Sequence, residues 1–422
     1  MKNILVFPCG NENALEILNS LTSFSDEYKV YGGSSVENIG KDLFKNYIDG
    51  IPFLNDLNFI KELNRIIDKF NIDFIFPTHD MVVYVLSKSL NQLNCSVLCP
   101  EIITSEIIRD KFKTYKHFDQ CEFIPKVYES TENIAFPIFI KPKIGELARN
   151  SYKINNQESL VDFLKDKNVD DYVISELLVG QEYTVECFTD SNGELLLVEA
   201  RQMNKYARGI FLESDLLNEI SEFEIIAKTI NSKLKFQGLW YFQCKRDING
   251  KAKLLEIAQK VNGTMSVLRV KGINLPYLTL QNYYSSSKPE LFVKDNPNVF
   301  LKRCFFNVIT HNINYTILIV DLDSTLFSKN SESLMMALMY QHLNRGGEIV
   351  AFTKQEERIE RDLKLSQTFF SDIFDDLSDL EQYNNFKDSI LISNDFTLMN
   401  CLNKKVNCFN SGDTQLLYDW KK

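Results

Sequence analysis

The sequence lacks a basic excess and long apolar segments, and these two absences exclude several classes of protein. It carries 47 Lys and Arg residues against 57 Asp and Glu residues, a formal net charge of −10. Nucleic-acid binders normally present a basic face, so nucleic acid is not an expected partner. The longest apolar runs, such as ILVF near the start and TILIV at 316–320, have the length of strands and fall short of the ~20 residues that cross a membrane. The N-terminal apolar stretch is too short for the core of a signal peptide, and Pro8 and Gly10 follow it at once.

Cysteine and histidine form no recognisable framework. The nine cysteines are scattered, with only Cys95 and Cys99 close together, and the four histidines do not stand at metal-ligand spacing from them. A disulfide scaffold and a zinc site are therefore not expected. We expect reduced, mostly buried thiols, a cytoplasmic location and no membrane partner.

The 422 residues, 44% apolar and 25% charged, are typical of a soluble protein with two or three domains of roughly 100–200 residues. In residues 1–104, predicted strands (KNILVFP, YKVYGG, IDFIFPT) alternate with predicted helices (ALEILNSL, FIKELNRIIDKFN, MVVYVLSKSLNQL). This alternation predicts a parallel sheet covered by helices, with ligands beyond the carboxyl ends of the strands. Three segments follow the strands at these carboxyl ends: residues 9–11, 32–35 and 77–80. Each alone is also typical of a plain strand-to-helix turn.

Between 105 and 296 the pattern changes to longer strands with hairpins. Asn192-Gly193 and Asn249-Gly250 each stand between alternating strands, the strongest short-range signal for a two-residue turn. In the second hairpin, a two-residue turn places Gln243 opposite Glu256, with Cβ atoms about 5 Å apart. That distance is short enough for both side chains to hold one cation.

Residues 285–300 carry Ser, Pro and Asn without periodicity and are predicted to be a linker. The remaining segment, 297–422, is predicted to be a small α/β domain. Its first strand ends in IVDLDSTLF, where Asp321 and Asp323 point the same way on an extended chain. Such a pair can supply one nucleophile and one proton carrier while both hold Mg²⁺.

The order of motifs from residue 1 to about 280 resembles the ATP-grasp superfamily, in particular the ligases similar to carbamoyl-phosphate synthetase. The resemblance rests on segments that stand in the family's order: IRDKFKTY, FPIFIKPKIG, ISELLVGQEYTVECF, residues 201–209, GLWYFQCKRDINGKAKLLEIAQKVNG and KGINLP. It implies a Rossmann-like pre-ATP-grasp α/β domain (1–104) followed by the two α+β lobes of the ATP-grasp domain (105–296).

The resemblance also implies roles for individual residues toward ATP and Mg²⁺. The implied phosphate ligands are Lys111 and Lys141, and Glu182 would hold the ribose. The strand ending at Glu176 would lead to the adenine hinge at Leu177 and Leu178. The magnesium ligands would be Gln243 and Glu256, and the groups facing the γ-phosphate or the carboxylate would be Arg201 and Lys260.

Two features depart from the family's pattern. The phosphate-covering loop is usually glycine-rich so that backbone N–H groups can approach the phosphates, but KIGELARNS has Gly145 alone, leaving Arg149 or Ser151 as substitutes. The metal-binding strand usually ends in a Glu-Ile-Asn-x-Arg type of motif, whereas this strand ends in EIAQK. Ala258 cannot bind a metal, so fewer protein ligands or a weakened activity are implied.

The C-terminal segment resembles the haloacid-dehalogenase-like (HAD-like) phosphatases through DxDxT, here Asp321, Asp323 and Thr325. The same resemblance assigns Thr353 to the second motif and Asp395 to the final metal ligand. Lys387 is the choice for the required lysine, with Lys364 as the alternative. The short spacing between Thr325 and Thr353 implies a small domain without a large cap and with an open site.

Together these resemblances imply a carboxylate–amine ligase that forms an amide through an acyl phosphate, fused to a domain that acts on a phosphate monoester. Its partners would be a small-molecule acid and amine, one of them phosphorylated in keeping with the fused domain. The alternative is a nucleotide-binding protein that does not ligate and whose only chemistry is the C-terminal phosphatase. The sequence leaves the substrates open, because such pockets vary within one fold, and it leaves a homodimer open.

Overall fold

The computed structural model describes residues 1–145, 149–207, 210–285, 299–303, 314–327, 333–363, 365, 369–384, 386–411 and 417. The chain forms two compact units, Met1–Phe305 with Lys422 and Phe306–Lys421. The first unit contains the predicted domains 1–104 and 105–296 together. The division falls after the 296/297 boundary expected from the sequence, because residues 300–302 pair with a sheet of the first unit.

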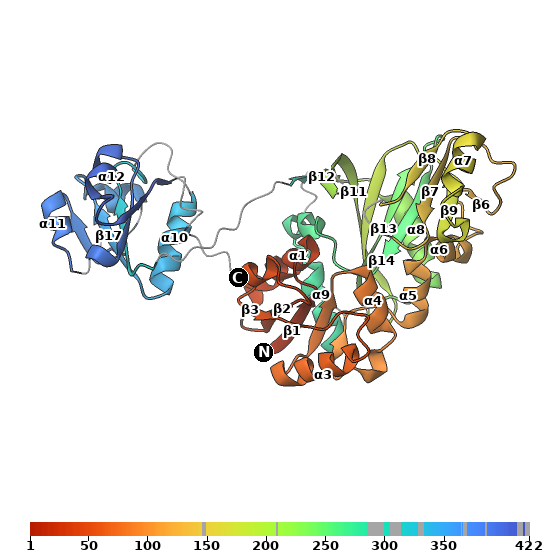
Figure 1. Cartoon of the computed structure of the whole chain (residues 1–422), viewed down its shortest axis with the longest axis horizontal. Coiled ribbons are helices and arrows are strands. Elements are labelled where there is room, and N and C mark those ends of the chain that lie inside the picture. Colours follow the sequence, from red (N-terminus) through yellow and green to blue (C-terminus); the bar gives the residue numbers. More distant parts are fainter. Residues whose placement is uncertain are drawn as a thin grey trace. The chain divides into compact units, whose positions relative to one another are not determined.

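The N-terminal part of the first unit is a parallel five-stranded sheet of order β3-β2-β1-β4-β5, as the βαβα pattern predicts (Figure 1). Leu5 and Ile75 of the sheet pack with Leu63 of α3 and Leu86 of α4 in one apolar cluster. The elements are β1 (Lys2–Phe7), α1 (Glu12–Leu21), β2 (Tyr28–Gly33), α2 (Gly40–Leu43), β3 (Asn46–Ile48), α3 (Phe59–Phe70), β4 (Phe74–Pro77), α4 (Asp80–Ser87) and β5 (Ser96–Val97). The helix expected over MVVYVLSKSLNQL ends early, at Ser87, and a 3-10 turn follows at Leu90–Gln92.

A smaller antiparallel sheet, of order β6-β9-β7-β8, follows in the chain. Its apolar side chains, Ile138, Ile140, Ile154 and Ile174, pack against Leu160 of α7. Its elements and the two preceding helices are α5 (Ile102–Arg109), α6 (Lys111–His117), β6 (Val127–Tyr128), β7 (Ile138–Pro142), β8 (Tyr152–Ile154), α7 (Gln157–Leu164) and β9 (Tyr172–Glu176).

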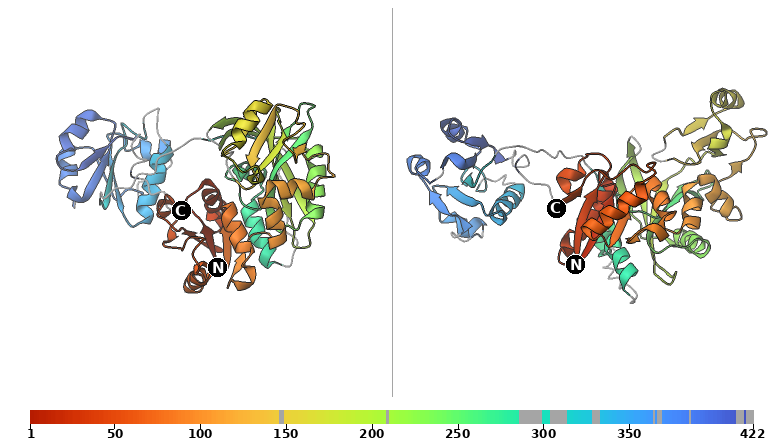
Figure 2. Two further views of the ribbon diagram at one scale, coloured as in Figure 1. Left: turned by 45° about the vertical axis from the view of Figure 1, so that its right-hand side comes forward. Right: turned by 60° about the horizontal axis from the view of Figure 1, so that its bottom comes forward.

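The third sheet has six antiparallel strands in the order β14-β13-β10-β11-β12-β15. Its strands between residues 182 and 258 are coloured yellow-green to green in Figure 2. One face is apolar and packs on α8, with Val185, Trp240 and Phe242 in the same cluster as Phe223 and Ile230 of that helix. The elements are β10 (Glu182–Thr189), β11 (Leu195–Ala207), β12 (Ile210–Leu216), α8 (Ser221–Lys233), β13 (Gly238–Arg246), β14 (Ala252–Ala258), η4 (Met265–Lys271), α9 (Leu275–Tyr284) and β15 (Phe300–Lys302). Most of the predicted linker lies outside the described residues, and its last residue, Phe300, begins β15.

The turns of the two Asn-Gly hairpins differ from the predicted two-residue type. In both, an aspartate two residues before the Asn, Asp190 or Asp247, accepts backbone N–H bonds across the loop. The backbone closes one residue wider than expected, since Asp247 N bonds Lys251 O and Gly250 takes a positive φ of 79°. This arrangement matches a three-residue loop with glycine in the left-handed region.

The C-terminal unit is a parallel five-stranded sheet of order β18-β17-β16-β19-β20. Buried clusters cover both faces, one around Leu318, Val320 and Met339, the other around Ile319, Leu391 and Leu402. The elements are β16 (Ile317–Asp321), α10 (Ser333–Asn344), β17 (Glu348–Phe352), β18 (Asp372–Phe374), α11 (Leu377–Glu381), β19 (Ser389–Ile392), α12 (Phe396–Leu402) and β20 (Asn407–Phe409). The α/β architecture expected here is confirmed, and among all described residues no helix is long and apolar enough to cross a membrane.

Candidate functional site

The second face of the six-stranded sheet is polar and carries four of the residues expected at the nucleotide site, Glu182, Arg201, Gln243 and Glu256. Directly opposed residues of antiparallel strands share a face. Gln243 opposes Glu256 on one side and Thr184 on the other, and Thr184 in turn opposes Arg201. The predicted pairing of Gln243 with Glu256 is therefore confirmed, although the turn that was to produce it is not the predicted one.

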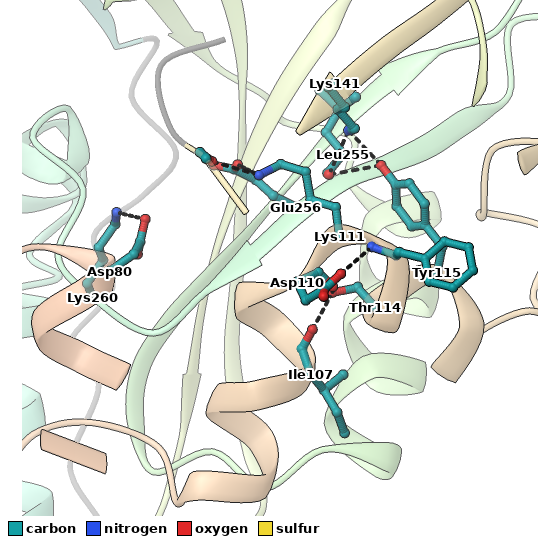
Figure 3. Close-up of polar contacts among 12 residues, drawn as sticks. Asp80, Ile107, Asp110, Lys111, Thr114, Tyr115, Lys141, Leu255, Glu256 and Lys260 are labelled. Carbon is teal, nitrogen blue, oxygen red and sulfur yellow. Dashed lines mark hydrogen bonds and ion pairs between the residues drawn. The ribbon is translucent and has the colours of Figure 1, made fainter. Parts of the chain in front are cut away.

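Two lysines from separate elements reach this face (Figure 3). Lys111 begins α6 after the N-cap Asp110, and its Nζ donates a hydrogen bond of 2.8 Å to the Gly145 carbonyl. The same Nζ lies 3.9 Å from the Glu256 carboxylate. Lys141, on β7, is 7% exposed and donates to the Tyr115 hydroxyl at 2.7 Å. Burial, and then the nearby charge of Lys111, lower the pKa of Lys141 to about 7.

Two carboxylates, Glu256 and Glu182, act electrostatically on Lys141. Burial raises the pKa of Glu182, and the charge of Glu256 raises it further, while Lys245, 3.8 Å from Glu182, acts in the opposite direction. The Glu182 and Glu256 carboxylates repel each other, and Gln243 stands opposite Glu256. A divalent cation bound here would relieve that repulsion. Mg²⁺ prefers oxygen ligands and usually keeps several waters and phosphate oxygens, so the Gln243 and Glu256 pair fits this ion without a third protein ligand at Ala258.

The segment after β9 connects the two antiparallel sheets. Glu176 ends that strand, and its Oε1 accepts a hydrogen bond of 2.8 Å from the Lys126 N–H, so this carboxylate fixes the neighbouring chain. Leu177 and Leu178 follow. Gly180 N then bonds Arg246 O on β13 at 2.9 Å. A Cβ on Gly180 would lie 2.6 Å from the Arg246 Cβ, so only glycine permits this approach.

The position of Arg201 does not agree with its expected role at the γ-phosphate or the carboxylate. Its side chain is 0% exposed and its guanidinium is enclosed by protein partners. Nε donates to the Glu186 carboxylate at 3.0 Å, Nη2 forms an ion pair with the same group, and Nη1 bonds the Thr264 hydroxyl. The guanidinium thus neutralises a buried carboxylate, and both charges would be costly without the other.

Lys260 lies at the edge of the N-terminal sheet that the sequence predicted to bind ligands. Its Nζ donates a hydrogen bond of 2.6 Å to Asp80, the first residue of α4 (Figure 3). Burial opposes ionisation of this carboxyl, but the Lys260 charge outweighs it and lowers the pKa of Asp80. The neighbouring loops are joined as well, through Asn11 Nδ2 to Thr78 Oγ1 at 2.9 Å.

A family model described as "ATP-grasp in the biosynthetic pathway with Ter operon" matches residues 168–300. That span includes Glu182, Gln243 and Glu256. This span of the chain is therefore similar to an ATP-grasp domain. A search of the curated proteins found no match.

Solved ATP-grasp structures share the fold of the first unit. The L-amino acid ligase from Bacillus licheniformis is 20% identical, with a TM-score of 0.54 over 67% of this chain and 74% of that one. N5-carboxyaminoimidazole synthetase from Staphylococcus aureus is 13% identical, with a TM-score of 0.56 over 68% and 78%. The biotin carboxylase domain of Hydrogenobacter thermophilus 2-oxoglutarate carboxylase, solved with MgADP, ADP and bicarbonate, is 13% identical, with a TM-score of 0.58 over 71% and 73%.

In the C-terminal unit, hydrogen bonds hold the two aspartates of the acidic loop. Asp321 is 3% exposed, and its Oδ2 accepts hydrogen bonds from the hydroxyls of Ser324 at 2.5 Å and Ser393 at 2.6 Å. Asp323 accepts a bond of 2.6 Å from the Thr353 hydroxyl. The first and second predicted motifs therefore meet at the carboxyl ends of β16 and β17.

Of the two other residues predicted for this site, Lys387 lies away from it, and Asp395 lies next to it with its carboxylate engaged elsewhere. Lys387 precedes β19, and the adjoining Asp388 bonds Thr316 at the start of β16, so this lysine lies at the opposite end of the strands from Asp321. Asp395 donates its N–H to the Ser393 hydroxyl at 2.9 Å, the same hydroxyl that bonds Asp321, while its carboxylate caps α12 by accepting from the N–H groups of Thr397 and Leu398. Within the described ranges no group of three or more His, Cys, Asp or Glu residues is placed to hold a metal, so the expected three-acid cluster does not form. The alternative lysine, Lys364, lies outside the described residues.

Sequence reasoning missed two residues that the structure brings to these sites. Asn394 donates from Nδ2 to Ser324 O at 3.0 Å and so lies beside the acidic loop. Its signal was available, since it precedes Asp395 directly after the strand. Tyr115 had no such signal, because a tyrosine in the middle of a short helix is typical of a core residue.

Proposed function

We propose that the chain is an ATP-dependent carboxylate–amine ligase that releases ADP and forms an amide through an acyl phosphate. The observation that carries the proposal is the convergence of Lys111, Lys141 and the Gln243–Glu256 pair on one polar sheet face. These groups come from an α-helix, a β-strand and a hairpin that are far apart in the sequence. The likeness to an L-amino acid ligase supports this reaction class at the level of fold.

In this proposal the two lysines bind phosphate oxygens as compact positive charges. The Leu177 and Leu178 backbone contacts adenine, and Glu182 accepts the ribose hydroxyls. Gln243 and Glu256 would hold Mg²⁺, which when bound offsets phosphate charge. The carboxylate oxygen of the acid attacks the γ-phosphorus while the bond to ADP breaks. The amine nitrogen then attacks the acyl carbon, and inorganic phosphate leaves.

We propose that Lys260 releases Asp80 when the acid substrate binds and donates to the reacting carboxylate instead. A lysine that already holds a carboxylate at 2.6 Å has a geometry suited to an acidic substrate. Arg201 takes no part in this step, because it is enclosed with Glu186.

For the C-terminal unit we propose a HAD-like site that acts on a phosphate monoester, with Asp321 as nucleophile and Asp323 as proton carrier. The hydrogen bonds that fix both carboxylates at the strand ends support this role. Lys387 is not included because it lies at the opposite end of the strands, and Asp395 is not included because its carboxylate caps α12. One substrate or product of the ligase would then carry the phosphate.

A second function is favoured by one observation, the alanine at 258. A strand that offers a single carboxylate to the metal suits a domain that binds nucleotide without turning it over. In that case the C-terminal unit would supply the only chemistry of the protein.

The test is ADP formation by the full chain with ATP, Mg²⁺ and pools of acids and amines. We expect ADP release that requires both an acid and an amine and that disappears in Glu256→Ala. Lys253→Ala, on the same strand, is the matched control and should keep the rate. ATP binding without ADP release under any pool would favour the second function.

A further inference from the structure

A tyrosine hydroxyl lies between the two strands that carry the proposed phosphate and metal ligands. Tyr115 is 2% exposed, and its hydroxyl donates a hydrogen bond of 3.0 Å to the Leu255 carbonyl. The same hydroxyl accepts the bond of 2.7 Å from Lys141 Nζ. Lys141 also donates to Leu255 O at 3.2 Å, so three groups form a closed triangle (Figure 3).

The carbonyl in this triangle belongs to the extra residue of a β-bulge. Between β13 and β14 the register passes from Cys244 opposite Leu254 to Gln243 opposite Glu256, and Leu255 is left over. A bulge residue is unpaired in the ladder, so its carbonyl needs partners from elsewhere. Tyr115 and Lys141 are those partners.

The bulge decides which face of the sheet Glu256 occupies. If the register at Cys244 and Leu254 continued without a bulge, Glu256 would stand opposite Phe242, which is 0% exposed in the apolar cluster. A one-residue slip moves every following side chain to the other face. With the bulge, Glu256 lies opposite Gln243 on the polar face.

Tyr115 shares its helix with a phosphate ligand. Lys111 and Tyr115 are four residues apart on α6, so their side chains lie on the same side of the helix. Lys111 reaches Gly145 and Glu256 from one turn, and Tyr115 reaches Leu255 and Lys141 from the next.

We propose that Tyr115 is a positioning residue that fixes Lys141 for phosphate and holds the bulge that directs Glu256 toward the metal. This inference rests on the proposed function of the same site. The tyrosine touches neither substrate nor metal and acts through the Leu255 carbonyl and Lys141.

The test is Tyr115→Phe in the full chain, which keeps the ring and removes the hydroxyl. Two quantities are measured: the Kd of ATP in EDTA, which reports Lys141, and the Mg²⁺ concentration that half-saturates ADP formation, which reports Glu256. We expect the Kd to rise about tenfold, equivalent to about 1.4 kcal/mol. We expect the Mg²⁺ requirement to rise severalfold.

Tyr183→Phe is the matched control. Tyr183 lies on β10 and is 8% exposed, and its hydroxyl accepts from Arg246 at 3.3 Å on the apolar side of the same sheet. It should leave both quantities unchanged. The thermal unfolding midpoint of each variant separates a loss of positioning from a loss of folding.

The outcomes are distinct. If wild-type protein binds ATP and Tyr115→Phe matches it in both quantities, the positioning role is overturned. A change in ATP affinity alone, with the Mg²⁺ requirement intact, overturns the part that concerns the bulge. Wild-type protein that binds no ATP overturns the proposed function, and this inference with it.

Discussion

At the scale of single residues, the proposed role of Lys141 at phosphate makes its charge depend on whether ATP is bound. Its pKa of about 7 means that near pH 8 most of the unliganded protein carries a neutral amine at this position. Bound phosphate favours the ammonium form. ATP binding at pH 8 is therefore expected to take up a large fraction of one proton, and ATP affinity should fall as the pH rises from 7 to 9. Calorimetry in two buffers of different ionisation enthalpy measures the uptake, and Lys141→Met should abolish it. Equal uptake in both proteins would contradict the assignment.

The same residue makes the stability of the free protein depend on pH. The folded pKa of about 7 lies below the unfolded value, so between these values the unfolded chain binds more protons. Stability then increases with pH from about 7 toward about 10, because the cost of burying the ammonium is fully present below that window and is relieved within it. We expect Lys141→Met to stabilise the protein near pH 7 by about 1–3 kcal/mol and to matter less near pH 10. Urea unfolding at the two pH values measures this, and parallel profiles for both proteins would refute it.

Arg201 and Glu186 form a buried pair that should matter for folding rather than for nucleotide binding. Both side chains are 0% exposed. Glu186→Ala leaves an uncompensated guanidinium, so we expect a loss of about 3–5 kcal/mol in the free energy of unfolding. Replacing both residues with methionine should recover most of that loss. If Glu186→Ala keeps its stability but loses ATP binding, the pair belongs to the site after all.

These residues show what can be predicted from a sequence at this scale. The types and order of Lys111, Lys141, Glu182 and Glu256 indicated phosphate and metal chemistry, and the structure gathers them on one face. Arg201 fits the same pattern of charge, yet its burial depends on Glu186, a tertiary partner on the adjacent strand. Local sequence contains no signal for that enclosure.

At the scale of elements, the β13–β14 hairpin has the predicted pairing of Gln243 with Glu256, but its turn is not the predicted one. The predicted two-residue turn was to place Gln243 opposite Glu256 directly. The loop is one residue wider, because Asp247 bonds the loop N–H groups, and the bulge at Leu255 restores the register. A bulge held by a side chain of α6 is a tertiary feature, so no local rule could have placed it. The choice of Lys387 fails for a different reason: a residue that precedes a parallel strand lies at its amino end, whereas Asp321 lies at the carboxyl end of β16.

The hinge between the two antiparallel sheets offers a test at the same scale. Gly180→Ala would force its Cβ against Arg246 and lengthen the Gly180 N to Arg246 O bond. The backbone at Leu177 and Leu178 should move with it, and ATP affinity is expected to drop about tenfold, equivalent to about 1.4 kcal/mol. Val179→Ala, an exposed neighbour in the same segment, is the control and should bind ATP normally. Fluorescence titration with an adenine nucleotide measures the affinity of each variant. Equal affinities of Gly180→Ala and Val179→Ala would show that this segment does not contact adenine.

At the scale of the whole molecule, the chain consists of two units with separate sheets and separate cores. The proposed ATP site draws its residues from the first unit, and Asp321, Asp323 and Thr353 belong to the second. Their hydrogen-bond partners also lie within their own unit. The proposed ligase and phosphatase sites are thus built from different residues, which makes their activities separable by substitution.

Asp321→Asn in the full chain tests whether these are two chemistries or one. The amide is isosteric and keeps an oxygen that can accept from Ser324 or Ser393, so folding should be little disturbed. Loss of the nucleophile removes the covalent intermediate, and hydrolysis of small phosphate esters should fall by orders of magnitude. ADP formation that depends on an acid and an amine should continue at the wild-type rate.

The alternative is that the second unit binds a phosphorylated substrate of the ligase without hydrolysing it. In that case wild-type protein hydrolyses none of the esters, and Asp321→Asn raises the KM of the ligase for a phosphorylated substrate while kcat is unchanged. Asp323→Asn separates the two cases further, because Asp323 accepts from Thr353 rather than from the serines. If Asp323 carries a proton, this substitution should change the pH dependence of ester hydrolysis, whereas if Asp323 only helps to bind the phosphate, it should change KM alone. The kinetic constant that moves therefore tells whether the second unit transforms the phosphate or only holds it.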